Sequence, residues 1–385
     1  MKPIHYLVAQ ITLNHTTLSA ARVLVSLYAI QLDASPLVVG TLAGLFAIIP
    51  TLFSVAMGRL VDRIGTRTLM MVCSLLIVGG ILLPFIWSDS VIPLFASALL
   101  VGGAYFAMFI VHTALGGFYG KPEDRATNFA HISLGLAAAN GLGPLIAGFA
   151  ADLIGFRLAF LFLALPALAA FAIFLVGKLP QRGPAAVTAK AANSGNSVFD
   201  LWRDPRMRPV YVISIYLMLL WDIFMVMTPI YGAQLKLSAS EIGIIMSTFS
   251  AASFVIRILL GPLSRRYTPM QLLLMSQALG AVAMVGFGLM SALPMLIIMA
   301  FAIGLGQGIG GPMVTTALYE VAPPARVSEA IGLRMSVGMA CQAILPLIAG
   351  GAASFVGVAP LFWLTGLILL AGAWMERSHW HRQSK

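Results

Sequence analysis

The sequence has very little charge. Asp, Glu, Lys and Arg make up 9% of its 385 residues, whereas hydrophobic residues make up 60%. A soluble globular protein is usually about a quarter charged and about half apolar. This chain lacks the charge to cover a water-facing surface, so we expect it to lie in a lipid bilayer.

Ligands for metals and groups for catalysis are also scarce. The only cysteines, Cys73 and Cys341, sit in apolar runs without metal-ligand spacing, so we expect them to be core residues. The chain shows no nucleotide-binding GxxxxGK(S/T) loop and no catalytic constellation. We therefore predict no enzyme activity, no cofactor and no metal site.

Acidic residues are fewer than basic ones, 13 against 23, which gives a net charge of +10. The basic residues gather in short loops between apolar runs, so we predict a membrane and not a nucleic acid as the partner. The first apolar stretch contains polar residues, which a cleavable signal lacks, and we interpret it as a retained membrane helix.

Long apolar runs are abundant. A helix needs about 20 residues to cross a bilayer, and twelve runs have a suitable length. The predicted spans cover residues 5–30, 37–58, 68–88, 92–118, 126–151, 157–178, 208–232, 240–261, 270–290, 294–318, 328–354 and 358–376. Lys and Arg concentrate in the termini and the even-numbered loops. Only Arg157, at the start of its span, and Lys236 lie at odd-numbered loops. The positive-inside rule then predicts that both termini are cytoplasmic, in the inner membrane of a bacterium.

The chain divides into two similar halves. The segment 179–207 is rich in small polar residues and is predicted to be a flexible cytoplasmic linker between a bundle at 1–178 and one at 208–385. "GRLVDR" at Gly58–Arg63 matches "GPLSRR" at Gly261–Arg266, and a second segment repeats at nearly the same offset. We therefore expect an all-α membrane protein with twelve transmembrane helices in two pseudo-symmetric six-helix bundles.

At this point the chain resembles the major facilitator superfamily. The loop between spans 2 and 3 has the form GxLxDRxG(R/K)(R/K), with Thr66 in place of one basic residue. The resemblance implies a rocker-switch carrier in which spans 1, 4, 7 and 10 line a central cavity. It also implies a gating role for Asp62 beside the start of span 11; the alternative is that the loop's arginines only set topology. The expected gating residues are Gly58, Asp62, Arg63, Gly65, Arg67 and Arg125.

Span 5 carries a second recognisable pattern. Gly143, Pro144 and Gly148 resemble part of the GxxxGPxxGG pattern of antiporter-type members of this superfamily. Small residues also permit close helix packing, so plain packing remains the alternative. Span 4 lacks the arginine that proton-coupled drug exporters often carry.

Ionisable residues inside the spans are the candidate substrate and proton-coupling groups, because each is costly in lipid. Asn14, His15 and Arg22 follow one polar stripe of span 1, and Asp222 lies beside Trp221 in span 7. We hypothesise that Arg22 and Asp222 couple across the cavity; a permanent structural pair, or no contact at all, are the alternatives. The remaining candidates are Tyr105, His112, Gln307 with Gly311 and Thr315 on one face of span 10, and Arg334.

Two of these candidates have alternatives of their own. His112 could carry a proton near neutral pH or simply be hydrogen-bonded to a neighbour. Arg334 could attract an anionic substrate or snorkel to the cytoplasmic surface.

The sequence favours a secondary active transporter, expected to be monomeric, that binds a small-molecule substrate and uses protons or another coupling ion. Proton-coupled efflux of small organic or amphiphilic compounds is the leading prediction. Uptake or exchange of a small organic anion bound by Arg22 and Arg334 is the alternative. A receptor or chaperone on the same scaffold is a third reading, which the short linker disfavours.

Overall fold

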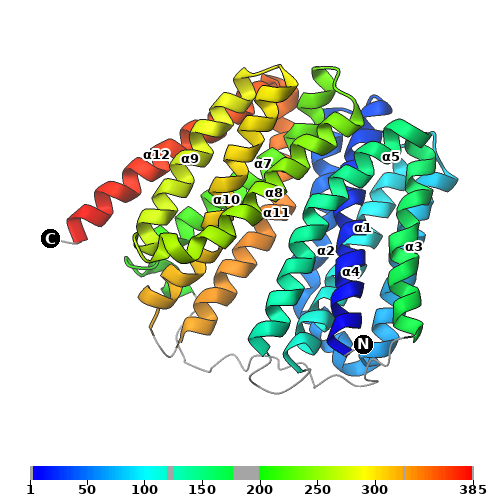
Figure 1. The fold of residues 1–385 in the computed structure, drawn as a ribbon, viewed down its shortest axis with the longest axis horizontal. Helices are drawn as coiled ribbons and strands as arrows, with labels where there is room; N and C mark the ends of the chain where they lie inside the picture. Colours follow the sequence, from blue (N-terminus) through cyan, green and yellow to red (C-terminus); the bar gives the residue numbers. More distant parts are fainter. Residues whose placement is uncertain (1–2, 119–124, 177–198, 324–325, 384–385) are drawn as a thin grey trace. The chain divides into compact units, whose positions relative to one another are not determined.

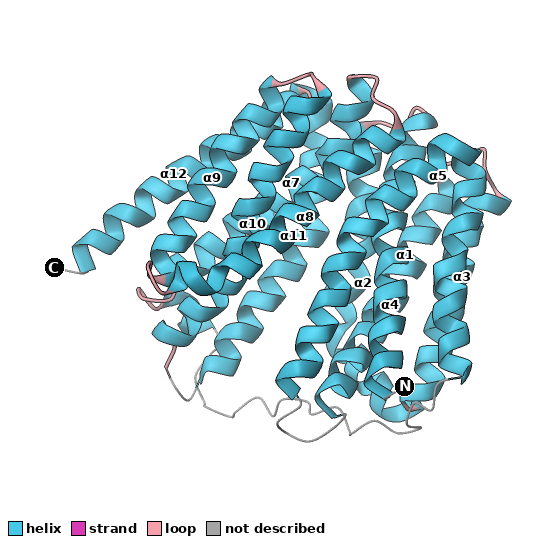
Figure 2. Cartoon of the chain, viewed as in Figure 1, coloured by secondary structure: helices cyan, strands magenta, loops and turns pink. Residues whose placement is uncertain are grey.

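A computed structural model describes residues 3–118, 125–176, 199–323 and 326–383. In some stretches, among them 54–64 and 376–383, only the backbone is described. Every regular element in the described residues is a helix, and no strand occurs among them (Figure 1, Figure 2).

The helices agree closely with the predicted spans. The first group is α1 (Pro3–Gln31), α2 (Pro36–Ile64), α3 (Thr66–Ile86), α4 (Ile92–Phe118) and α5 (Arg125–Val176). The second group is α6 (Phe199–Arg203), α7 (Arg208–Gln234), α8 (Ala239–Ser264), α9 (Pro269–Leu289), α10 (Leu293–Val321), α11 (Val327–Val356) and α12 (Ala359–Gln383).

Helix α5 differs from the prediction of two separate runs. It continues for 52 residues, with a break in helical geometry at Gly155, where φ is 78° and ψ is 158°. A helix of that length would extend about 78 Å, far more than one bilayer crossing of about 30 Å. Glycine accepts the positive φ without a Cβ clash, so two spans join without an intervening loop.

The described chain forms two compact units. The first contains α1–α5 together with Lys236–Ser247, so the beginning of α8 belongs to it. The second contains α6, α7, the rest of α8 and α9–α12. In the first unit α1 packs along α5, and α4 packs against α2 and α3.

In the second unit α9 packs between α10 and α12, and Figure 1 shows α9 beside α12. Helix α7 contacts α10, α11 and α12. The short helix α6 adds Leu201 to the core of this unit, and Trp202 stacks on Tyr211 with ring centroids 5.6 Å apart.

The composition of the helices is that of a membrane protein. Among the described residues, nine helices are long and apolar enough to cross a membrane, and α5 is long enough for two spans. Many large apolar side chains face outward, among them Leu153 at 79% and Phe355 at 91% exposure. Such a surface suits lipid and not water, and the predicted all-α membrane fold is confirmed.

Candidate functional site

The polar stripe of α1 meets α4 inside the first unit. His15 Nδ1 lies 2.6 Å from the hydroxyl of Tyr105, and the two ring centroids are 5.2 Å apart. Asn14 is buried and donates from Nδ2 to the carbonyl oxygen of Gln10 at 3.0 Å. The structure therefore brings together the predicted residues His15 and Tyr105.

Arg22 lies two turns further along α1. Its Cζ is 5.7 Å from the centroid of the Phe46 ring in α2, and its charge acts on His15. A guanidinium over an aromatic face is held by a cation–π interaction. Asn140 of α5 is a further polar neighbour of His15. Asn140 was not among the predicted site residues, because nothing local shows which helix α5 faces.

His112 is buried, with 1% of its surface exposed. Its Nδ1 lies 2.7 Å from the Met108 carbonyl oxygen, and its Nε2 lies 3.3 Å from Oε1 of Gln10. Gln10 in turn donates to the Ala170 carbonyl oxygen at 3.4 Å. These contacts tie α1, α4 and α5 together, so they agree with the hydrogen-bonded alternative; a proton-carrying role for His112 remains a prediction. Gln10 was not predicted, although it lies one turn from Asn14.

Arg334 is held by two other helices in the second unit. Its Nε donates to the Ser214 hydroxyl of α7, and one terminal nitrogen donates to the Thr315 hydroxyl of α10, both at 3.2 Å. The side chain points between helices and not only toward a membrane surface. Ser214 was not predicted, because a single serine in an apolar helix carries no signal of its own.

About one helical turn from Arg334 and Thr315, α11 and α10 each carry a glycine with few or no neighbours. A Cβ at Gly338 of α11 would meet only the sulfur of Met218 in α7, at 3.8 Å, and a Cβ at Gly311 of α10 would meet nothing within 4 Å. Further along, Asp222 of α7 is 5% exposed and acts electrostatically on Cys341 of α11. The spacing of about four residues places the groups of each helix on one face of that helix.

Two other predicted residues border this region. Gln307 of α10 is 8% exposed, and its Oε1 makes no hydrogen bond within the part of the chain that is described. Trp221 packs edge-on against Phe249 with ring centroids 5.3 Å apart. The Trp221 contact is one of packing, whereas the Gln307 Oε1 can accept a hydrogen bond from a ligand.

The predicted gating residues are only partly described. The side chains of Asp62, Arg63 and Arg125 and the surroundings of Gly58 are not among the described parts of the chain. Gly65 stands just before α3 with a φ of 85°, and the Cζ of Arg67 lies 5.9 Å from the centroid of the Phe174 ring. Glycine accepts this positive φ, so Gly65 permits the turn between α2 and α3, and its gating role stays a prediction.

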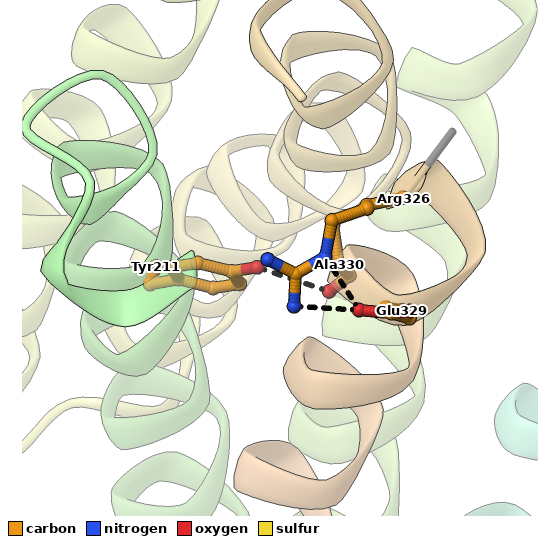
Figure 3. A network of polar contacts seen from close by, with 4 residues as sticks. All are labelled: Tyr211, Arg326, Glu329 and Ala330. Carbon is orange, nitrogen blue, oxygen red and sulfur yellow. Dashed lines mark hydrogen bonds and ion pairs between the residues drawn. The ribbon is translucent and has the colours of Figure 1, made fainter. Parts of the chain in front are cut away.

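The first turn of α11, where Asp62 was expected, has an acid of its own. Glu329 accepts from Nε and a terminal nitrogen of Arg326, both at 2.7 Å. The hydroxyl of Tyr211 donates to the Ala330 carbonyl oxygen at 3.3 Å (Figure 3). A carboxylate near a helix N-terminus is favourable, so Glu329 supplies one such charge, and the role of Asp62 stays a prediction.

The glycine pattern of α5 serves two neighbours. A Cβ at Gly143 would lie 2.6 Å from Cβ of Ser19 in α1. A Cβ at Gly148 would overlap the Ala239 carbonyl oxygen, and a Cβ at Gly243 would lie 2.5 Å from the carbonyl oxygen of Pro144. The pattern therefore lets α5 approach α1 and the beginning of α8 closely, as the packing alternative required.

No group of three or more potential metal ligands occurs among the described residues. The arrangement instead offers separate polar clusters in apolar surroundings, a setting that suits solute binding within a membrane.

Sequence comparison identifies the family. The profile described as the Major Facilitator Superfamily matches residues 7–293 and 210–379. This chain belongs to the Major Facilitator Superfamily. A curated relative, the probable sulfoacetate transporter SauU of Cupriavidus necator, is 26% identical over 145 residues, which cover 38% of this chain and 33% of that relative. The match thus spans about a third of the relative's length.

Solved structures of superfamily transporters share the fold. A bacterial homolog to the human lysosomal transporter Spinster, in an inward-facing and occupied conformation, has a TM-score of 0.82 at 14% identity, covering 98% of this chain and 96% of that one. The nucleoside transporter NupG has a TM-score of 0.78 at 14% identity, covering 99% of each chain. The peptide transporter POT in complex with sulfate has a TM-score of 0.73 at 17% identity, covering 98% and 95%.

Proposed function

We propose that this superfamily transporter carries small organic anions and that Arg334 binds the anionic group. The observation that carries the proposal is the pair of hydrogen bonds from Arg334 to Ser214 and Thr315. Both acceptors are neutral hydroxyls, so they orient the guanidinium without cancelling its charge. The two bonds use two of its five N–H donors.

An oriented cation among apolar helices is suited to a carboxylate or sulfonate. Charge inside a membrane protein is costly, and its presence usually marks a substrate or ion pathway. A guanidinium also matches the two oxygens of such groups through paired, charge-assisted hydrogen bonds. The name of the partial relative, a probable sulfoacetate transporter, supports the same chemical class.

Efflux of amphiphilic compounds, which the sequence favoured, has less support from the geometry. Its main local argument was the span-5 pattern, and those residues are accounted for by close packing on Ser19 and on Ala239. Efflux remains the competing proposal, and the transport assay below separates the two.

The test is uptake of labelled acetate and sulfoacetate into proteoliposomes that contain the purified chain. Arg334→Gln should lower uptake about 10- to 100-fold, as expected for the loss of a charged hydrogen bond of about 1.5–3 kcal/mol, and Arg334→Lys should retain part of the rate. Arg257→Gln is the matched control, because Arg257 is an exposed arginine of α8.

The proposal would be overturned if the Arg334→Gln variant took up both acids at the rate of the wild type. Failure of the wild type to move either acid, with lowered accumulation of a cationic dye in cells that overproduce it, would favour efflux.

We also propose a monomer in a bacterial inner membrane that uses protons as the coupling ion. From the distribution of Lys and Arg we propose that both termini are cytoplasmic. The halves are proposed to be residues 1–178 and 208–385, with Arg22 and Asp222 as their coupled pair. Reporter fusions at residue 385 test the topology, and an external reporter signal would contradict it. Partial recovery of transport when Arg22→Asp is combined with Asp222→Arg would support direct pairing.

A further inference from the structure

Gly311, one helical turn from the Arg334 partner Thr315, has open space where a side chain would stand. Among the described glycines, five would place a Cβ in open space, namely Gly79, Gly155, Gly261, Gly311 and Gly332. Four of them are exposed on the outside of their helices, and Gly311 is the one that is partly enclosed. A side chain at this partly enclosed position would therefore fill space that no nearby described atom occupies.

Thr315 fixes the position of this open space relative to Arg334. The Thr315 hydroxyl donates to the Gly311 carbonyl oxygen at 3.3 Å while it accepts from Arg334 at 3.2 Å. Gly311 is therefore one helical turn from a direct partner of the guanidinium, on the same face of α10. A group bound to Arg334 would extend along this face.

A second observation indicates a ligand here. Gln307 lies one further turn along the same face, is 8% exposed, and has an Oε1 that makes no hydrogen bond within the described chain. A buried amide oxygen without a partner costs about 1–3 kcal/mol unless a ligand or water supplies a donor. The neighbouring Gly310 has no such open space, because a Cβ there would lie 2.5 Å from the Leu217 side chain.

We propose that Gly311 is a specificity-determining residue: its missing side chain makes the room that receives the body of a small organic anion held by Arg334, with Gln307 at the far end. The inference rests on the proposed function and adds that position 311 sets the size of the anion that is bound. A side chain at position 311 would occupy the space that the carbon skeleton needs. Short acids would still reach Arg334, whereas longer ones would clash.

The experiment is equilibrium binding of acetate, butyrate and hexanoate to the purified full-length chain. Gly311→Leu should weaken butyrate and hexanoate at least 10-fold and acetate less than 3-fold. Gly261→Leu is the matched control, because Gly261 also has open space but faces outward; it should leave all three affinities unchanged. Should Gly311→Leu fail to fold, Gly311→Ala serves, because alanine favours a helix by about 1 kcal/mol over glycine.

The outcomes separate the two proposals. If Arg334→Gln abolishes binding of all three acids and the position-311 variants keep the wild-type length profile, the role of Gly311 is overturned and the proposed function stands. If Arg334→Gln binds the acids as the wild type does, the proposed function fails, whatever the position-311 variants show. The inference is supported if Gly311→Leu loses affinity for the longer acids selectively and Gly261→Leu does not.

Discussion

The carboxylate of Asp152 in α5 accepts a hydrogen bond from the backbone N–H of Ser240, at 2.7 Å, and a second from Ala239, at 3.1 Å. These are the first two N–H groups of α8, which no turn of that helix can satisfy. Ser238 and Glu241 complete the end as a reciprocal capping box, with bonds of 2.8 and 3.2 Å. An acid 87 residues earlier in the chain therefore helps to start α8.

Replacing this acid should loosen the start of α8. Asp152→Asn keeps the shape but removes the negative charge and one acceptor, so we expect a loss of about 1 kcal/mol of stability, or roughly 2 °C in melting temperature. Thermal unfolding in detergent measures it. Asp33→Asn is the control, because Asp33 is exposed and asparagine tolerates its φ of 57°. Equal shifts in both variants would contradict a capping role.

The glycines of α5 and α3 predict opposite responses to the same substitution. Gly148→Ala places a methyl group on the Ala239 carbonyl oxygen and should destabilise the fold by about 2 kcal/mol or more. Gly79→Ala meets nothing within 4 Å and should gain up to about 1 kcal/mol through helix propensity. Melting temperatures of the two variants measure these changes in stability. A higher melting temperature for Gly148→Ala would contradict close packing of Gly148 against Ala239.

The hydroxyls that hold Arg334 should affect binding more than stability. Ser214→Ala and Thr315→Val each remove one acceptor, so anion affinity should fall about 5- to 10-fold in each variant, for about 1 kcal/mol of lost orientation. Thr316→Val is the control, because Thr316 is exposed and its hydroxyl donates to the Pro312 carbonyl oxygen of its own helix. A Thr316→Val loss as large as that of Thr315→Val would argue against positioning.

The contact between His15 and Tyr105 should be needed for the first unit to keep its packing. Tyr105→Phe removes the hydroxyl that lies 2.6 Å from His15 Nδ1 and leaves a buried imidazole nitrogen without it, at a cost of about 1–3 kcal/mol. Tyr267→Phe, at an exposed position, should change nothing measurable. Thermal unfolding of both variants is the measurement, and unchanged melting of Tyr105→Phe would show that another group replaces the hydroxyl.

The two copies of the loop between spans should differ in importance. Asp62→Asn should lower transport and shift the carrier away from its outward-facing state, because the resemblance assigns that acid to gating. Arg265→Gln changes the corresponding position of the second copy and should matter less. Transport rates and accessibility of an external cysteine probe compare the variants, and equal losses would count against an asymmetric gate.

The sequence by itself determined the class of fold and the helix positions. Hydrophobic runs report burial in lipid residue by residue, so ten of the helix ranges, α1–α4 and α7–α12, follow from composition within several residues. Helix α5 joins two predicted spans through a kink at Gly155, and the short helix α6, which lies inside the predicted linker, was not predicted. The stripe containing His15 and the face containing Gln307 were also readable, because helical spacing is local.

The tertiary structure alone decided which faces meet. Ser214 and Arg334 are 120 residues apart, and Asp152 and Ser240 are 88 apart. Helix rotation and register in a membrane are set by many small packing contacts and not by one strong local signal. Ser214 and Asp152 look ordinary in the sequence; one contacts Arg334 and the other caps α8 only because packing brought their helices together.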